Sequence, residues 1–188
     1  MRTIGDEFPK FQLRALSGLS IGEMTAENAF IDINGETYAE RWKVIFFYPM
    51  DFTFICPTEI LGFASLYQDF QRRNAQILAC STDSEYAHWA WRKHSPRLSE
   101  IPFPLLSDMS RSLSQALGVI NPTNGVAQRA LFIVDPQNII RFVMVTDENV
   151  GRSPEETLRV LDALQTKALC PCSWTKGQKT IDAFGTNI

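Results

Sequence analysis

The chain has 188 residues, 45% of them hydrophobic, and a formal net charge of −3. This length and apolar content suffice for one domain with a sizeable core. Acidic and basic residues are interspersed, which excludes the basic surface that nucleic-acid binding requires. No apolar stretch reaches the roughly 18 residues of a membrane-spanning helix, so we expect neither a nucleic-acid nor a membrane partner.

Four cysteines stand at positions 56, 80, 170 and 172. The first seven residues include acids and lack the apolar core of a signal peptide, so we expect a cytoplasmic protein. In that compartment cysteines act as thiols or catalytic disulfides rather than as a structural framework. The chain has no paired Cys-x-x-Cys spacing and only two histidines, both in one predicted helix, so we expect no metal and no other cofactor.

Strands and helices alternate through the first half of the chain. The first 40 residues are expected to add edge strands. An apolar run predicts a buried strand at 44–48, helical spacing predicts a helix at 56–73, and a second apolar run predicts a strand at 76–81. The connection through a helix makes these two strands parallel.

The second half begins with predicted helices at 85–94 and 111–117. Two strands follow at 129–134 and 139–145, joined by a hairpin turn, and a final amphipathic helix covers 153–168. Parallel strands followed by an antiparallel pair predict an α/β fold of the thioredoxin-like type, with a mixed central sheet flanked by helices.

Cys56 lies where the first apolar strand gives way to a helix. In the first turn of a helix, free backbone N–H groups and the positive end of the dipole favour the nucleophilic thiolate. The alternative is a small buried hydrophobe, the usual role of a free cysteine. Thr53, three residues earlier, can place a hydroxyl beside the sulfur or cap the helix. Position alone leaves both readings open.

The residues around Cys56 resemble a known signature. Residues 47–59, FYPMDFTFICPTE, resemble the active site of typical two-cysteine peroxiredoxins. Further similar segments extend over nearly the whole chain: Ile4-Gly5-Asp6, Ser81-Thr82-Asp83-Ser84, Phe132-Ile133-Val134-Asp135-Pro136, Gly151-Arg152-Ser153 and Cys170-Pro171. Within this family the chain is most similar to the peroxidase subunit of bacterial alkyl hydroperoxide reductase. The ending Cys170-Pro171-Cys172-Ser173-Trp174 resembles the mycobacterial kind.

The resemblance implies a thiol-specific peroxidase that reduces hydrogen peroxide and organic hydroperoxides in antioxidant defence. Cys56 would attack the peroxide and become a sulfenic acid, which Cys170 of a partner subunit would resolve as an intersubunit disulfide. Thr53 and Arg129 would donate hydrogen bonds in the active site, and Pro49 would shield the sulfur from water.

Several of these residues also have plainer interpretations. Arg129 can be a solvated charge at a strand edge, and Pro49 can simply end its strand. Glu59 can orient Arg129 or stabilise the N-terminus of the helix. Cys172 can be an alternative resolving thiol, a relay of electrons from the reductant or a bystander. The family position of His88 suggests the substrate entrance.

The resemblance divides the chain into a peroxiredoxin domain, residues 1–165, and a C-terminal segment, residues 166–188, that carries the resolving cysteine. It also implies a homodimer assembling into a ring, a decamer or dodecamer. The reductant would be a lipoyl-fed AhpD-type protein, an AhpF-type flavoprotein or thioredoxin. Two other functions compete. A thiol–disulfide oxidoreductase would need a second cysteine where Glu59 stands, and a ring-forming holdase would need no reactive thiol.

Overall fold

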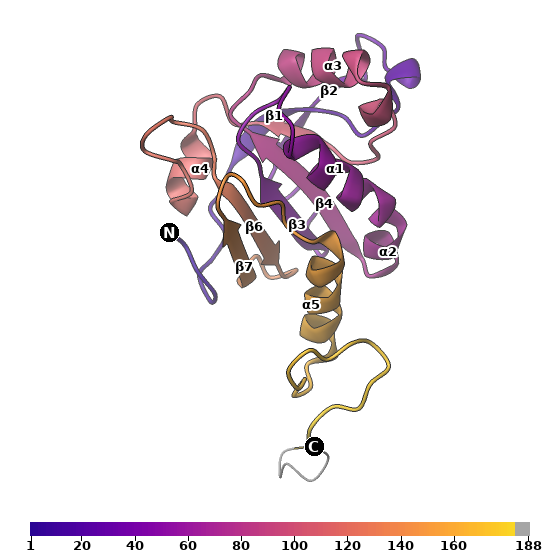
Figure 1. Cartoon of the computed structure of the whole chain (residues 1–188), viewed down its shortest axis with the longest axis vertical. Coiled ribbons are helices and arrows are strands. Elements are labelled where there is room, and N and C mark those ends of the chain that lie inside the picture. Colours follow the sequence, from indigo (N-terminus) through magenta and orange to yellow (C-terminus); the bar gives the residue numbers. More distant parts are fainter. Residues whose placement is uncertain (183–188) are drawn as a thin grey trace.

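The computed structural model describes residues 1–182, which form a seven-stranded sheet with helices on both faces (Figure 1). In chain order the elements are β1 (Gln12–Leu16), η1 (Ile21–Glu23), β2 (Phe30–Asn34), β3 (Trp42–Phe47), α1 (Cys56–Ser65), α2 (Tyr67–Arg72), β4 (Ala75–Ser81), α3 (Glu85–His94), η2 (Pro96–Leu98), β5 (Leu105–Ser107), α4 (Ser112–Leu117), β6 (Arg129–Val134), β7 (Ile140–Thr146) and α5 (Pro154–Thr166). The predicted mixed sheet flanked by helices is confirmed.

The strands lie in the order β2-β1-β5-β4-β3-β6-β7. β3 pairs in parallel with β4 and antiparallel with β6, and β4 pairs in parallel with β5. The other pairs, β1 with β2 and with β5 and β6 with β7, are antiparallel. β3 therefore lies inside the sheet, and the loop at its carboxyl end leads directly to α1.

Both faces of the sheet are covered, which is why β3 is apolar at every position from Val44 to Phe47. On one face Phe46 of β3 stacks on Phe63 of α1, with ring centroids 4.5 Å apart, in a core that α2, α3 and α5 also help to cover. On the other face Phe47 and Phe132 pack with Phe8 of the N-terminal segment and with residues of α4. Figure 1 shows α4 on the opposite side of the sheet from α1 and α2.

Two expectations about the elements are wrong in detail, and one strand was not predicted. The single helix predicted at 56–73 is two helices, α1 and α2, broken at Leu66. Just before the break the Ser65 hydroxyl donates to the Gly62 carbonyl at 2.7 Å, a local bond of the kind that competes with helix geometry. Of the predicted edge strands only β2 is at an edge, because β1 pairs on both sides. The three-residue strand β5 is not predicted at all, since it is too short to show a period.

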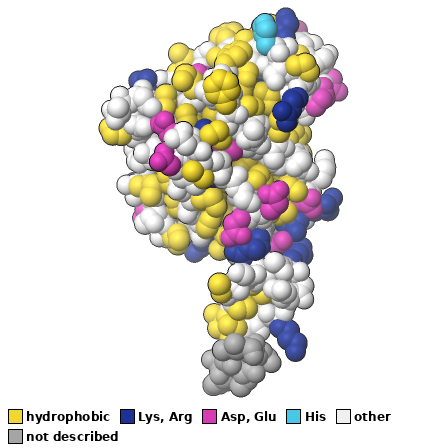
Figure 2. Space-filling view, viewed as in Figure 1, with side chains coloured by type: hydrophobic (Ala, Val, Ile, Leu, Met, Phe, Trp, Pro, Cys, Tyr) yellow, Lys and Arg dark blue, Asp and Glu magenta, His cyan; other side chains and the backbone are white. Residues whose placement is uncertain are grey.

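The chain beyond α5 is built differently from the rest. Residues 167–182 contain no helix or strand, apart from one bridge between Leu169 and Ile181. Figures 1 and 2 show this segment projecting from the end of α5, away from the sheet. The predicted C-terminal segment, 166–188, continues through residues 183–188, which lie outside the described residues.

No helix within residues 1–182 has the length and apolarity to cross a membrane. On the face in Figure 2, acidic and basic side chains are scattered in small mixed groups.

Candidate active site

Cys56 is the first residue of α1, reached from β3 through the loop 48–55. Its side chain is fully buried, whereas Phe52 and Phe54 of the loop are 58% and 92% exposed. Phe52 has a φ of 56°, in the left-handed region that a bulky side chain seldom adopts. The loop thus turns Phe52 and Phe54 outward while the thiol remains inside.

The backbone offers fewer free donors than expected for a helix start. The N–H groups of Thr58 and Glu59 both donate to the Ile55 carbonyl, at 2.9 and 3.3 Å. Pro57 has no N–H. Within the described residues, the N–H of Cys56 itself is therefore the one free donor of this turn.

Arg129, the first residue of β6, supplies the side-chain donor. Its Nη1 lies 3.4 Å from Cys56 Sγ and 2.7 Å from Glu59 Oε2, and its Nε donates to the Glu148 carbonyl at 2.8 Å. Only 4% of Arg129 is exposed, so the interpretation as a solvated strand-edge charge is wrong. A buried guanidinium with this many acceptors is held in one orientation.

Glu59 is bound by two arginines. Besides Arg129, the backbone N–H and Nε of Arg152 donate to Oε1 at 2.9 and 2.7 Å, and its Nη2 donates to Oε2 at 3.0 Å. Two buried guanidiniums and one carboxylate leave a net positive charge beside the sulfur, which favours a negative charge there. Glu59 therefore orients Arg129, one of its two predicted roles.

Arg152 is the residue that the sequence reasoning missed. It lies within Gly151-Arg152-Ser153, a matched segment to which no role was assigned. The side chain also donates to the Ala130 carbonyl at 2.6 Å and is 5% exposed. Its partner Glu59 is 93 positions away along the chain, so no local pattern reveals the pair.

Thr53 and Pro49 line a hollow of about 450 Å³ together with Arg129. The Thr53 hydroxyl donates to the Met50 carbonyl at 2.8 Å, so in this structure its hydrogen does not point to the sulfur. Its alternative role as helix cap is wrong, because the N-cap residue is Ile55 and no side chain caps α1. Pro49 is buried just beyond the end of β3, a position compatible with both of its interpretations.

A buried polar network fixes the loop from behind. Asp51 accepts from the Tyr48 hydroxyl at 2.8 Å and lies 2.7 Å from His88 Nδ1, while His88 Nε2 lies 3.2 Å from the Leu106 carbonyl. Burial raises the pKa of Asp51, and its hydrogen bond to His88 opposes that rise. His88 is fully buried, so its expected place at the substrate entrance is wrong. It anchors the loop to α3 instead.

Cys170 and Cys172 lie beyond α5. Cys170 is half-buried, with Sγ 3.5 Å from Thr166 Oγ1, and Cys172 is exposed. Arg152, which binds Glu59, lies just before the N-terminus of α5. Because α5 has 13 residues, its C-terminal end lies about 20 Å from Glu59. A disulfide needs Cα atoms within about 7 Å, so Cys170 is out of reach of Cys56 in the same chain.

The remaining cysteine, Cys80, is fully buried in β4, where burial raises its thiol pKa well above the usual value. All four cysteines are free thiols. Within residues 1–182 no group of three or more His, Cys, Asp or Glu side chains is placed to hold a metal ion.

A mixed sheet with a buried thiol at a helix start, held against a guanidinium, defines a site for thiol chemistry. The chain belongs to the AhpC/TSA family, which matches residues 4–143. It is 51% identical over 184 residues to alkyl hydroperoxide reductase C of Mycobacterium tuberculosis, covering 96% of this chain and 94% of the relative. Its identity to alkyl hydroperoxide reductase C of Mycolicibacterium smegmatis is 47%, with the same coverage of 96% and 94%.

Solved structures agree with this assignment. The structure of Mycobacterium bovis AhpC matches with a TM-score of 0.86 at 50% identity, covering 93% of this chain and 98% of that one. A reduced 2-Cys peroxiredoxin of Plasmodium vivax matches with a TM-score of 0.88 at 32% identity, covering 97% and 94%. The predicted family and the thioredoxin-like peroxiredoxin fold are confirmed.

Proposed function

We propose that this chain is a thiol peroxidase that reduces hydrogen peroxide and organic hydroperoxides, with Cys56 as the nucleophile. The observation that carries the proposal is the 3.4 Å contact between Cys56 Sγ and Arg129 Nη1, with Arg129 fixed by Glu59. The relatives named alkyl hydroperoxide reductase C and 2-Cys peroxiredoxin support the same class of enzyme.

In the first step the Cys56 thiolate attacks one peroxide oxygen. The S–O bond forms as the O–O bond breaks, and the leaving oxygen takes a proton to become water or an alcohol. Arg129 and the free Cys56 N–H are the fixed donors for the charge that develops on oxygen. Because the Thr53 hydrogen is given to Met50, its oxygen is available to accept from the hydroperoxide O–H and orient it.

In the second step a thiol condenses with the Cys56 sulfenic acid, releasing water. We assign this thiol to Cys170 of a partner subunit, because Cys170 of the same chain is about one α5 length away. The first turn of α1 must open for the two sulfurs to meet.

The assembly and the reductant complete the proposal. A homodimer suits the intersubunit disulfide, and a decameric or dodecameric ring is the assembly we expect for this family. A reductase partner must then reduce the disulfide: a lipoyl-fed protein, a flavoprotein or thioredoxin. Cys172 is exposed two residues from Cys170, where it can receive such a partner. A cytoplasmic location fits a cycle that returns to free thiols.

One experiment assigns the three thiols together. Wild type and the Cys56→Ser, Cys170→Ser and Cys172→Ser variants receive one equivalent of hydrogen peroxide, followed by a non-reducing gel and mass spectrometry. We expect a disulfide-linked dimer in wild type and Cys172→Ser, no peroxide consumption in Cys56→Ser, and one turnover per chain in Cys170→Ser. Steady turnover of Cys56→Ser or Cys170→Ser with a disulfide reductant would contradict the proposal.

The thiol–disulfide oxidoreductase alternative is disfavoured at the atomic level. Glu59, at the position of the second cysteine of such a motif, accepts hydrogen bonds from both Arg129 and Arg152. Replacing it by a thiol would leave two buried guanidiniums without their carboxylate.

A further inference from the structure

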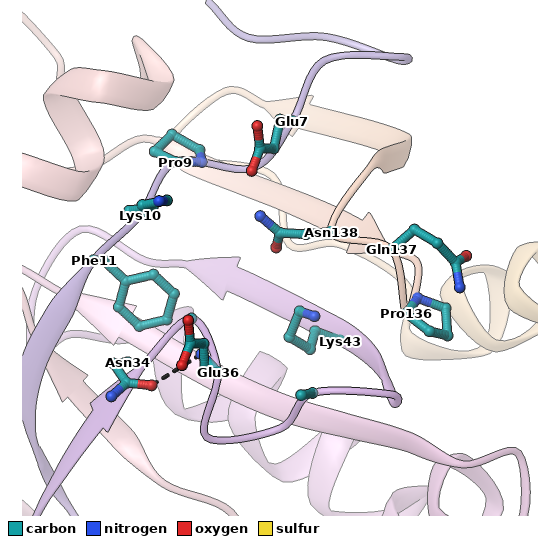
Figure 3. A pocket seen from close by; sticks show the side chains of 12 residues that line it. Glu7, Pro9, Lys10, Phe11, Asn34, Glu36, Lys43, Pro136, Gln137 and Asn138 are labelled. Atoms are coloured by element: carbon teal, nitrogen blue, oxygen red, sulfur yellow. Dashed lines mark hydrogen bonds between the residues drawn. The ribbon is translucent and has the colours of Figure 1, made fainter.

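A second pocket lies at the opposite end of β3 from Cys56. It has a volume of about 480 Å³ and is bounded by the N-terminal segment, the β2–β3 connection and the β6–β7 turn (Figure 3). Lys43, near the start of β3, is one of its lining residues, whereas Pro49 of the Cys56 site follows the end of that strand. Six residues of extended chain separate them by about 20 Å, and the two hollows share no lining residue.

Lys43 is a buried cation that has no bonded partner among residues 1–182. It is 3% exposed, and its ammonium group makes no hydrogen bond or ion pair within residues 1–182. The only fully sealed side-chain nitrogen or oxygen atoms without a partner in that range are Ser17 Oγ and Arg41 Nε, so the Lys43 ammonium keeps a narrow opening to the pocket. Figure 3 shows the side chain among the lining residues.

The nearby acid does not satisfy this lysine. Asp135 is buried in the β6–β7 turn, and its Oδ2 accepts from Arg141 Nε at 2.6 Å. Its Oδ1 accepts from the backbone N–H groups of Gln137 and Ile139, at 3.0 and 2.9 Å. Burial accordingly lowers the pKa of Lys43, and the charge of Asp135 only opposes that effect. An anion that reaches a buried ammonium of this kind stabilises it by forming a charge-assisted hydrogen bond.

The rest of the lining limits which anion fits. The rim carries exposed Lys10 but also exposed Glu7 and Glu36, so a ligand with two or more negative charges would meet repulsion there. The Phe11 ring and Pro136 give apolar surface on opposite sides of Lys43. The volume lies within the range of roughly 300–1,000 Å³ that small-molecule sites occupy.

We propose that this pocket binds a small organic monocarboxylate, with its carboxylate on Lys43 and its apolar body between Phe11 and Pro136. The site is separate from the peroxidase chemistry, and its ligand recognition does not depend on the proposed function.

Isothermal titration calorimetry with benzoate, and with its neutral analogue benzamide, tests the proposal on the full chain. We expect benzoate to bind wild type at least tenfold more tightly than benzamide. Lys43→Met keeps the apolar stem and removes the charge, so benzoate binding should weaken at least tenfold while benzamide binding is unchanged. Lys43→Arg should retain benzoate binding, and the matched control Lys10→Met, on the exposed rim, should change it by less than about threefold.

Two controls separate a loss of benzoate binding from a loss of folding and from a loss of peroxide reduction. Thermal unfolding without ligand checks each variant; if Lys43→Met does not fold, Phe11→Ala should weaken benzoate binding in its place. Peroxide consumption should be the same in wild type and Lys43→Met. The proposal is overturned if benzoate fails to bind wild type at millimolar concentration, if benzamide binds equally well, or if benzoate binds Lys43→Met as tightly as wild type.

Discussion

The surroundings of Cys56 and of Cys170 differ in almost every physical respect. Cys56 is fully buried at the start of α1, and its sulfur faces an arginine that is itself bonded to Glu59 and a backbone carbonyl. Cys170 is half-buried in a segment without helix or strand, and among residues 1–182 its sulfur has two weak hydrogen-bond partners, Thr166 Oγ1 at 3.5 Å and the Ala163 carbonyl at 3.9 Å. The Cys56 thiol is therefore fixed by its surroundings, whereas the Cys170 thiol has few contacts that hold it.

This difference matches the two steps of the proposed cycle. Attack on a peroxide gains most from donors that are in position before charge develops. Disulfide formation instead requires two distant sulfurs to approach, and a segment with few bonds costs the least free energy to move. The region around the attacking thiol is therefore held by many bonds, and the region around the resolving thiol is held by few.

The largest contrast should appear in thiol labelling. Burial, and then the charge of Asp108, raises the pKa of the Cys80 thiol well above its usual value, whereas Cys172 is exposed. Cys80 should react with iodoacetamide only when the sheet opens, about 10³-fold or more slowly than Cys172. Peptide mapping by mass spectrometry after timed labelling measures both rates. Comparable rates would show that β4 opens as easily as the C-terminal segment.

The second test breaks the support of the attacking thiol. Glu59→Gln removes the carboxylate that both Arg129 and Arg152 contact, which should lower the free energy of unfolding by about 3–5 kcal/mol and slow peroxide reduction sharply. Urea unfolding and a peroxide-consumption assay measure the two effects.

The matched control for Glu59 is Glu156→Gln. Glu156 pairs with Arg159 at 2.6 Å on the surface of α5, where its side chain is 43% exposed. Such a pair contributes only about 0–1 kcal/mol, and peroxide reduction should not change. Equal losses of stability and of peroxide reduction in the two variants would mean that buried Glu59 contributes no more than a surface carboxylate.

These contrasts also explain what the sequence could predict. Cys56 at the helix start and the βαβ unit were predictable because apolar runs, helical spacing and a local signature lie within a few dozen residues. The burial of Arg129 was not, since its neighbours in the chain are those of any strand residue. The Glu59–Arg152 pair joins α1 to the residue just before the N-cap of α5 and exists only after folding. Tertiary ion pairs of this kind leave no periodic pattern in the chain.

Short elements were missed for a related reason. The three residues of β5 are held by β4 and β1 on either side, so pairing partners rather than its own sequence make it a strand. Likewise the break at Leu66 coincides with a side-chain hydrogen bond from Ser65 to the Gly62 carbonyl. Propensity averaged over a window cannot detect either feature.

The smallest expected effect concerns the anchor behind the active-site loop. Burial raises the pKa of Asp51 in the folded protein, with Asp83 adding to the rise and with His88 and Tyr48 opposing it. The folded state therefore holds this proton more tightly than the unfolded state does. This contribution favours folding at low pH and is lost as pH rises through the raised pKa.

Asp51→Asn should remove that pH dependence while keeping the loop anchored. The amide oxygen can accept from the Tyr48 hydroxyl, and the amide nitrogen can donate to His88 Nδ1, because His88 Nε2 already donates to the Leu106 carbonyl. Urea unfolding between about pH 4 and pH 7 should show the stability of wild type falling relative to the variant as pH rises. The control Asp32→Asn, in an exposed pair with Arg14, should change the free energy of unfolding by only about 0–1 kcal/mol. If Asp51→Asn instead loses the same stability at every pH, the carboxylate is needed as an acceptor from His88, and the loop is held by an ion pair.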